Sequence, residues 1–99
     1  MIRHIVLWTL NDGTLEEKEA IKLKIKKDIE ALKDIIPGIV SLQVITEPMA
    51  ETSGDIVLDS VLENEEALAN YQIHEEHQKV VTYIRSVVKN RICIDYHEM

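Results

Sequence analysis

Apolar residues follow the spacing of a β-strand in four segments of this chain and the spacing of an α-helix in the segments between them. Side chains alternate between two faces in a strand, whereas in a helix every third or fourth residue shares a face. The order along the chain is strand, helix, strand, strand, two helices, strand. Because the chain has 99 residues, we expect one α+β domain over residues 1–99. Its predicted architecture is ferredoxin-like, a four-stranded antiparallel sheet with helices on one face.

Capping and breaking residues mark the ends of the long helix. Thr14 and Glu17 have the spacing of a capping box, which predicts that the helix begins here. Pro37 cannot continue a helix, and Gly38 readily adopts the left-handed conformation that often ends one. The expected elements are strands over 2–10, 40–44, 55–63 and 91–97, a helix over 15–36, a short helix from residue 65, and a longer helix after a break at 74–76.

Alternation assigns the strand residues to faces. In the first strand His4 shares a face with Val6 and Trp8. In the second strand Val40, Leu42 and Val44 are expected on one face, and the polar residues between them on the other. The third strand alternates in the same way.

The face of the sheet turned away from the helices predicts a homodimer. Ile5, Leu7, Val57 and Val61 would lie on it, and the chain has no further element to cover them. A contiguous exposed apolar patch normally marks an interface, so we expect two copies to pack sheet against sheet. Asp59 would lie on the same face and would need a hydrogen-bond partner across the interface.

Composition narrows the class of partner. The net charge of −7 repels phosphate backbones, so no nucleic-acid partner is expected. No apolar run approaches the roughly 20 residues of a membrane span, so no membrane partner is expected. The single cysteine, Cys93, excludes an intramolecular disulfide and fits a cytoplasmic location. With no base near it in the sequence, Cys93 is interpreted as a small buried hydrophobe.

His4, Tyr71 and His77 are the candidate functional residues, because histidine is the side chain that titrates near neutral pH. His77 shares a helix face with Val81 and therefore should project toward the sheet. Tyr71 and His77 are six residues apart and would diverge on one continuous helix. They can converge only if the chain bends between them, and His74 is the expected cap at such a bend.

Together the three side chains could catalyse proton transfer. An imidazole in a partly apolar pocket can act as a general base near pH 7. A phenol can donate a hydrogen bond to a carbonyl oxygen whose negative charge increases during proton transfer. The set would suit enolisation, isomerisation or cyclisation of a carbonyl compound without a cofactor. The alternative interpretation is structural, with the histidines as satisfied core residues and Tyr71 as a core-edge aromatic whose hydroxyl reaches water. The spacing of His74 and His77 is not that of a zinc helix.

Four segments resemble the stress-responsive A/B-barrel (Dabb) family of dimeric α/β barrels. The resemblance covers nearly the whole chain and implies that ferredoxin-like monomers pair through their sheets into a shared barrel. It also implies that His4 faces the helices. The segments are Met1-Ile2-Arg3-His4-Ile5-Val6-Leu7, Ile36-Pro37-Gly38-Ile39, the stretch from Leu68 to His77, and Arg91-Ile92-Cys93-Ile94-Asp95-Tyr96.

The resemblance further implies a small-molecule pocket between the helices and the sheet. One plant member of the family, an olivetolic acid cyclase, closes a linear polyketide without a cofactor, and its working residues match His4, Tyr71 and His77. No cofactor is expected here. The expected lining of the pocket is Val6, Trp8, Ile25, Ile29, Leu58, His74, Val81 and Ile84. Some relatives hold a cation with main-chain carbonyls at positions that match Lys33, Ile36 and Ile39.

Two functions remain open at this stage. The first is a homodimeric Dabb-domain protein that binds a small apolar or carbonyl-containing molecule. The alternative is a cofactor-independent enzyme, similar to a polyketide cyclase, isomerase or monooxygenase, with His77 as general base and with Tyr71 and His4 as its polar partners.

Overall fold

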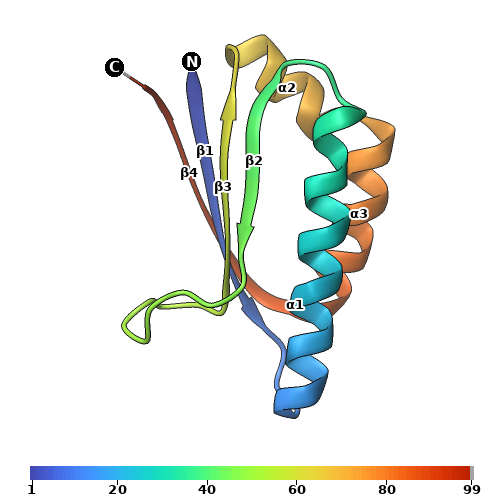
Figure 1. Cartoon of the computed structure of the whole chain (residues 1–99), viewed down its shortest axis with the longest axis vertical. Coiled ribbons are helices and arrows are strands. Elements are labelled where there is room, and N and C mark those ends of the chain that lie inside the picture. Colours follow the sequence, from blue (N-terminus) through green and yellow to red (C-terminus); the bar gives the residue numbers. More distant parts are fainter. Residues whose placement is uncertain (99) are drawn as a thin grey trace.

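The structure is a computed structural model and describes residues 1–98. Its elements follow the predicted order of strands and helices (Figure 1). The final strand begins earlier than the predicted residue 91, because the chain passes directly from the last helix into it. The elements are β1 (Ile2–Leu10), α1 (Leu15–Glu30), a 3₁₀ turn η1 (Ala31–Asp34), β2 (Ile39–Ile45), β3 (Ile56–Leu62), α2 (Glu65–Ile73), α3 (Glu75–Val87) and β4 (Val88–His97).

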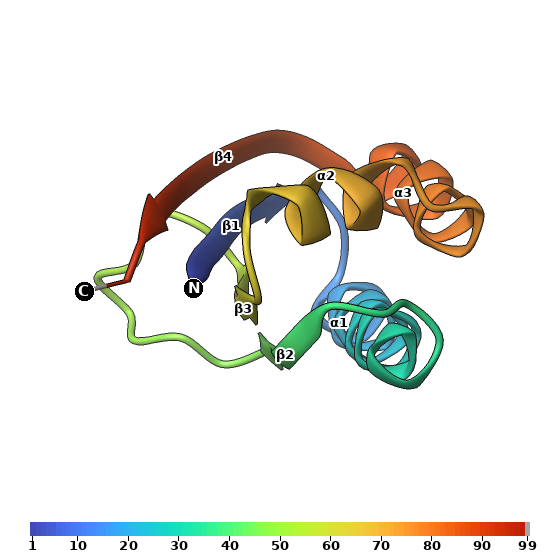
Figure 2. The ribbon, with the colours of Figure 1, turned by 90° about the horizontal axis from the view of Figure 1, so that it is seen from above.

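The four strands form one antiparallel sheet in the order β2-β3-β1-β4. All three helices lie on one side of it, with α1 and α3 running next to each other (Figures 1 and 2). Within residues 1–98, no helix covers the opposite side of the sheet. The predicted α+β, ferredoxin-like architecture is therefore confirmed.

The central strand β1 separates core from surface by strict alternation. His4, Val6, Trp8 and Leu10 are buried, and the residues between them are only half-buried. The buried set faces the helices, where it packs with residues such as Ile29 in one continuous apolar core. His4 therefore lies on the helix side, as the family resemblance implied.

The first helix is shorter than the predicted range of 15–36. Thr14 and Glu17 form the capping box at its start, and α1 ends at Glu30. The chain then tightens into η1, which is common at the end of an α-helix. Both Leu32 and Ile36 stay buried through this turn, so the apolar stripe continues although the α-helix does not. None of the helices within residues 1–98 is long and apolar enough to cross a membrane.

Strand β2 departs from simple alternation at its start. Its register against β3 shifts between Ile39 and Ser41, so β2 carries one extra residue there. Ile39 is 9% exposed and joins the core with Leu42 and Val44, whereas Val40 is 39% exposed. The expectation that Val40 lies on the buried face was wrong, because the bulge exchanges its place with that of Ile39.

Apolar side chains occupy the sheet face that carries no helix. Register pairing places Ile94 of β4 opposite Ile5, and Ile92 opposite Leu7. In the single chain Ile92 is 48% exposed and Ile94 is 56% exposed. With Val57, on β3, they form a contiguous patch across three strands. Ile5, Leu7 and Val57 lie on the predicted face, whereas Val61, also predicted for the exposed patch, is only 8% exposed in the single chain.

Asp59 on the same face has its partner within the chain. The guanidinium of Arg3 donates to Asp59 at 2.7 Å and to Glu98 at 3.0 Å. The prediction that Asp59 needs a partner across a dimer interface was wrong, because Arg3 lies beside it on the neighbouring strand β1.

Candidate functional site

A cavity of about 550 Å³ lies between the helices and the helix-facing side of the sheet. It contains the three candidate functional residues, His4, Tyr71 and His77, in its lining. Six of the residues predicted for the pocket also line it, namely Val6, Trp8, Ile29, Leu58, Val81 and Ile84.

Two residues predicted for the lining lie elsewhere. Ile25 is fully buried and fills the core beneath α1. His74 stands between α2 and α3, where its Nδ1 accepts a hydrogen bond from the backbone N–H of Glu76 at 3.1 Å. Both predictions are corrected, because the side chain of Ile25 packs in the apolar core and that of His74 caps α3.

The bend at His74 brings Tyr71 and His77 together. His74 has extended backbone angles and serves as both the last cap of α2 and the first cap of α3. Glu75 and Glu76 follow in the first turn of α3, where the helix dipole favours acidic side chains. The rings of Tyr71 and His77 lie 4.2 Å apart between centroids. The two side chains therefore meet, as predicted, because the helix is broken between them.

His77 has one ring nitrogen committed to the backbone. Its Nδ1–H donates to the carbonyl oxygen of Gln72 at 3.2 Å, since a carbonyl can only accept. This leaves Nε2 as the nitrogen available to a ligand. Burial lowers the pKa of His77 below its ordinary value, and the nearby charge of Arg91 adds to this effect. The imidazole is therefore neutral near pH 7 and able to take up a proton.

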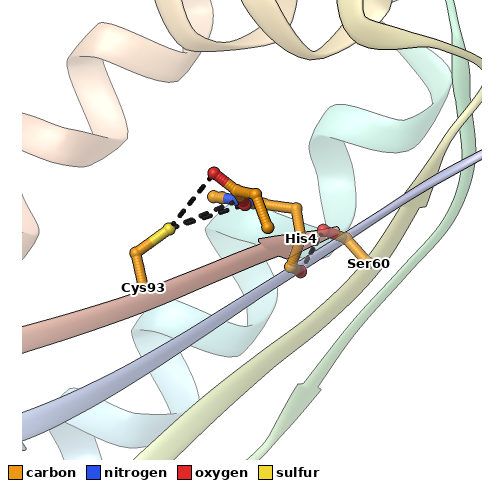
Figure 3. Close-up of polar contacts among 4 residues, drawn as sticks. His4, Ser60 and Cys93 are labelled. Carbon is orange, nitrogen blue, oxygen red and sulfur yellow. Dashed lines mark hydrogen bonds and ion pairs between the residues drawn. The ribbon is translucent and has the colours of Figure 1, made fainter. Parts of the chain in front are cut away.

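His4 is buried and held from two sides (Figure 3). Its backbone carbonyl accepts a hydrogen bond from the hydroxyl of Ser60 at 2.7 Å. Its Nδ1–H donates to the carboxylate of Asp95, which lies directly opposite it in the β1–β4 pairing. Asp95 was not among the residues predicted for the site. These contacts fix the ring and again leave Nε2 for a ligand.

Cys93 lies beside the same pair of residues. Its sulfur is 3.7 Å from Nδ1 of His4 and 3.5 Å from each carboxylate oxygen of Asp95. Cys93 is partly buried and packs against the apolar core, as interpreted. The expectation that no base lies near it was wrong, because strand pairing places His4 beside it. Burial raises the pKa of the Cys93 thiol, and the charge of Asp95 raises it further.

His4, Cys93 and Asp95 offer three possible metal-ligand atoms within 4.8 Å of one another. A metal ion would require Nδ1 of His4 to give up its hydrogen bond to Asp95 and the thiol to lose its proton. The geometry therefore favours a hydrogen-bonded set. The main-chain cation site predicted at Lys33, Ile36 and Ile39 falls in the turn from η1 to β2 and remains a prediction.

Tyr71 carries the most unusual polar atom of the site. The residue is 1% exposed, and within residues 1–98 its hydroxyl has no hydrogen-bond partner. The expectation that this hydroxyl reaches water was wrong, because the bend at His74 turns the ring inward. Burial raises the pKa of Tyr71 above its ordinary value, so the phenol stays protonated and can donate. His4 lies on its other side, with the two rings 6.2 Å apart in an edge-on arrangement.

Comparison with known families and structures identifies the family and the fold. The family model of the stress-responsive A/B-barrel domain matches residues 2–98. The chain belongs to the Dabb family. No match was found among curated proteins.

Solved structures share the fold over nearly the whole chain. A dimeric protein of unknown function with a ferredoxin-like fold from Bacteroides fragilis is 30% identical, with a TM-score of 0.90, and the match covers 98% of this chain and 95% of that one. A Dabb family protein from Mesorhizobium loti is 22% identical, with a TM-score of 0.73 and coverage of 99% and 96%. An antibiotic biosynthesis monooxygenase is 13% identical, with a TM-score of 0.77 and coverage of 100% and 99%, and shows the shared fold alone.

Replacing Tyr71 by phenylalanine should raise the stability of the protein. A buried hydroxyl without a partner costs on the order of 1 kcal/mol, and Tyr71→Phe removes that cost while keeping the ring. We therefore expect the free energy of unfolding, measured by urea denaturation, to increase by about 1 kcal/mol. Tyr83→Phe is the control, because it also removes a tyrosine hydroxyl but from a half-buried ring. The ring and its contact with the ammonium of Lys24, 4.7 Å from the ring centre, remain after the substitution. A clear loss of stability in Tyr71→Phe would show that the hydroxyl makes a stabilising bond.

Proposed function

We propose that this Dabb domain is a homodimer that binds a small apolar or carbonyl-containing molecule in the cavity between its helices and sheet. The observation that carries the proposal is the hydroxyl of Tyr71, which is buried at the cavity and unpaired within residues 1–98. A ligand oxygen that accepts its hydrogen bond would remove the cost of leaving it unpaired. The remaining features of the cavity support the same reading.

The cavity has the properties of a small-molecule site. Its volume lies in the range of roughly 300–1,000 Å³ that is usual for such sites. Leu58, Val81 and Ile84 supply apolar surface, and Tyr71 and the two histidines are among the polar groups of the lining. This combination favours a molecule with an apolar body and one oxygen-bearing end.

The uncovered sheet face supports the homodimer. Ile92 and Ile94 are exposed in the single chain, Ile5, Leu7 and Val57 are half-buried, and burying this patch against a second copy is favourable. The relative from Bacteroides fragilis is described as dimeric. We propose that two copies of this chain meet through the patch around Ile94 and Ile5.

A charge in that patch should convert the dimer to a monomer. Ile94→Glu places a carboxylate where the partner sheet would bury it, which is costly without a counter-charge. Light scattering behind a sizing column should give about twice the chain mass of 11.4 kDa for the unchanged protein and the single-chain mass for Ile94→Glu. Ile73→Glu is the matched control, because Ile73 is 75% exposed on α2. A monomer in the unchanged protein, or a dimer in Ile94→Glu, would contradict this interface.

Filling the cavity should abolish ligand binding. Trp8 is the single tryptophan of the chain and lines the cavity, so its fluorescence reports occupancy. Decanoate and the neutral decanamide are suitable probes with apolar chains. We expect at least one of them to change the fluorescence of Trp8, and Val81→Phe to reduce its affinity about tenfold or more by occupying the space.

Thr82→Phe is the control for this experiment. Thr82 is the next residue of α3, but its side chain is exposed and does not line the cavity. It should leave the affinity unchanged. Failure of both probes to affect Trp8, or equal effects of the two substitutions, would count against a ligand-binding cavity.

The second candidate function is a cofactor-independent enzyme, and a specific arrangement favours it. His77 presents a neutral imidazole whose Nδ1–H donates to the backbone carbonyl of Gln72, and beside it lies the phenol of Tyr71, which has no hydrogen-bond partner within residues 1–98. In an enolisation, Nε2 of His77 would take a proton from the carbon next to a carbonyl. The electrons of that C–H bond would move toward the carbonyl oxygen, which would accept a hydrogen bond from Tyr71. Returning the proton to a carbon completes an isomerisation.

His4 would act as a second polar partner in such a reaction. Its bond to Asp95 fixes the ring and stabilises any positive charge that the imidazole gains. The pairing is buried on the histidine side, which keeps its orientation constant.

Proton exchange on a simple ketone tests the catalytic candidate. The protein should accelerate exchange of the α-protons of 2-octanone in deuterated water, followed by NMR. His77→Gln should reduce the acceleration by about 10²-fold or more, because general-base catalysis contributes that much. His97→Gln is the control, since His97 is exposed and pairs with Glu65 at 3.2 Å. Equal exchange rates in both variants would remove His77 from the catalytic role while leaving ligand binding intact.

A further inference from the structure

The cavity carries a charge opposite to that of the whole protein. The chain has 18 acidic and 11 basic residues and a net charge of −7. The cavity lining nevertheless includes Arg85, Lys89 and Arg91 and no aspartate or glutamate. Random placement of side chains from this composition would put more acidic than basic residues at the cavity. The sign of the charge at the cavity therefore needs an explanation of its own.

Two of the three basic groups have no carboxylate to neutralise them. Lys89 forms an ion pair with Asp12 at 3.1 Å. Neither Arg85 nor Arg91 lies within 4.0 Å of a carboxylate oxygen among the residues that the structure describes. Most ion pairs of the chain join neighbours on one helix or on paired strands, as in the pair of Lys24 and Asp28. Arg85 and Arg91 are both exposed, so a ligand can reach their guanidinium groups, although Arg91 also lies close to the thiol of Cys93, whose pKa its charge lowers.

The two arginines approach the cavity from different elements. Arg85 lies on α3, one turn beyond Val81, and both residues line the cavity. Arg91 lies on β4 opposite Trp8, a residue on the helix-facing side of the sheet. Burial raises the pKa of Tyr71, and the positive charge of Arg91 opposes that rise. An anionic group between the arginines would therefore lie near the polar end of the cavity.

We propose that Arg85 and Arg91 select a ligand whose apolar body carries a carboxylate group. This inference rests on the proposed function, because it names the class of molecule that would occupy the same cavity. The apolar body contacts the floor formed by residues such as Leu58 and Ile84, and the carboxylate accepts hydrogen bonds from the guanidinium forks. Tyr71 supplies a further donor to an oxygen of the same ligand.

The surroundings favour a carboxylate over a phosphate. Phosphates are commonly bound at helix N-termini through backbone N–H groups. The helix that begins nearest to the cavity, α3, carries Glu75 and Glu76 in its first turn, and these would repel a dianion. A carboxylate carries one charge, so the same two glutamates oppose it less than they oppose a dianion, and it can still pair with a guanidinium fork.

Titration of Trp8 fluorescence with three probes tests the proposal. The probes are decanoate, decanamide and decyl phosphate, which share one chain length and differ in the head group. They are applied to the unchanged protein, to Arg85→Gln and Arg91→Gln, and to Lys27→Gln as a control with an exposed lysine outside the cavity. We expect decanoate to bind about tenfold or more tightly than decanamide. Each arginine substitution should lower that preference several-fold, and Lys27→Gln should preserve it.

Other outcomes would overturn the proposal in distinguishable ways. Equal affinities for decanoate and decanamide would show that the cavity binds ligands without reading their charge, so the proposed function would stand and the carboxylate would not. Tighter binding of decyl phosphate than of decanoate would overturn the choice of head group. No fluorescence response to any probe would overturn both the proposed function and this inference.

Discussion

The alternation of side chains along β1 is the constraint on which the rest of the structure depends. This strand pairs with β3 on one side and β4 on the other, so its two faces set the two faces of the central sheet. Its buried face places His4 in line with Val6 and Trp8, next to the helices. Its other face presents Ile5 and Leu7 away from them. A shift of one residue in pairing would exchange these roles and remove the candidate site.

Much of the fold could be predicted because the periodic signals are local. The capping box at Thr14 was sufficient to place the start of the first helix, and alternation was sufficient to group the residues of β1 and β3 by face. The family resemblance implied which face of β1 meets the helices. The bulge at Ile39 was not predictable, since it depends on how β2 aligns with a strand distant in the sequence. The 3₁₀ turn after Glu30 was missed for a similar reason: an apolar stripe does not distinguish the two helix types when both keep Leu32 buried.

The candidate site could also be predicted only where it depends on local sequence. The meeting of Tyr71 and His77 could be predicted, because it required only a bend at His74 within one stretch of sequence. The environment of Cys93 and the bond between His4 and Asp95 could not, because both depend on the register between the first and last strands. The burial of the Tyr71 hydroxyl also escaped prediction, since exposure at a bend is decided by packing in three dimensions.

The bond between His4 and Asp95 joins residues that are 91 positions apart in the sequence. Contacts of such separation are entropically expensive to form, so they follow the assembly of the segments between them. The polar end of the cavity therefore exists only in the fully assembled chain, and loosening β4 will disable it before the apolar core is lost.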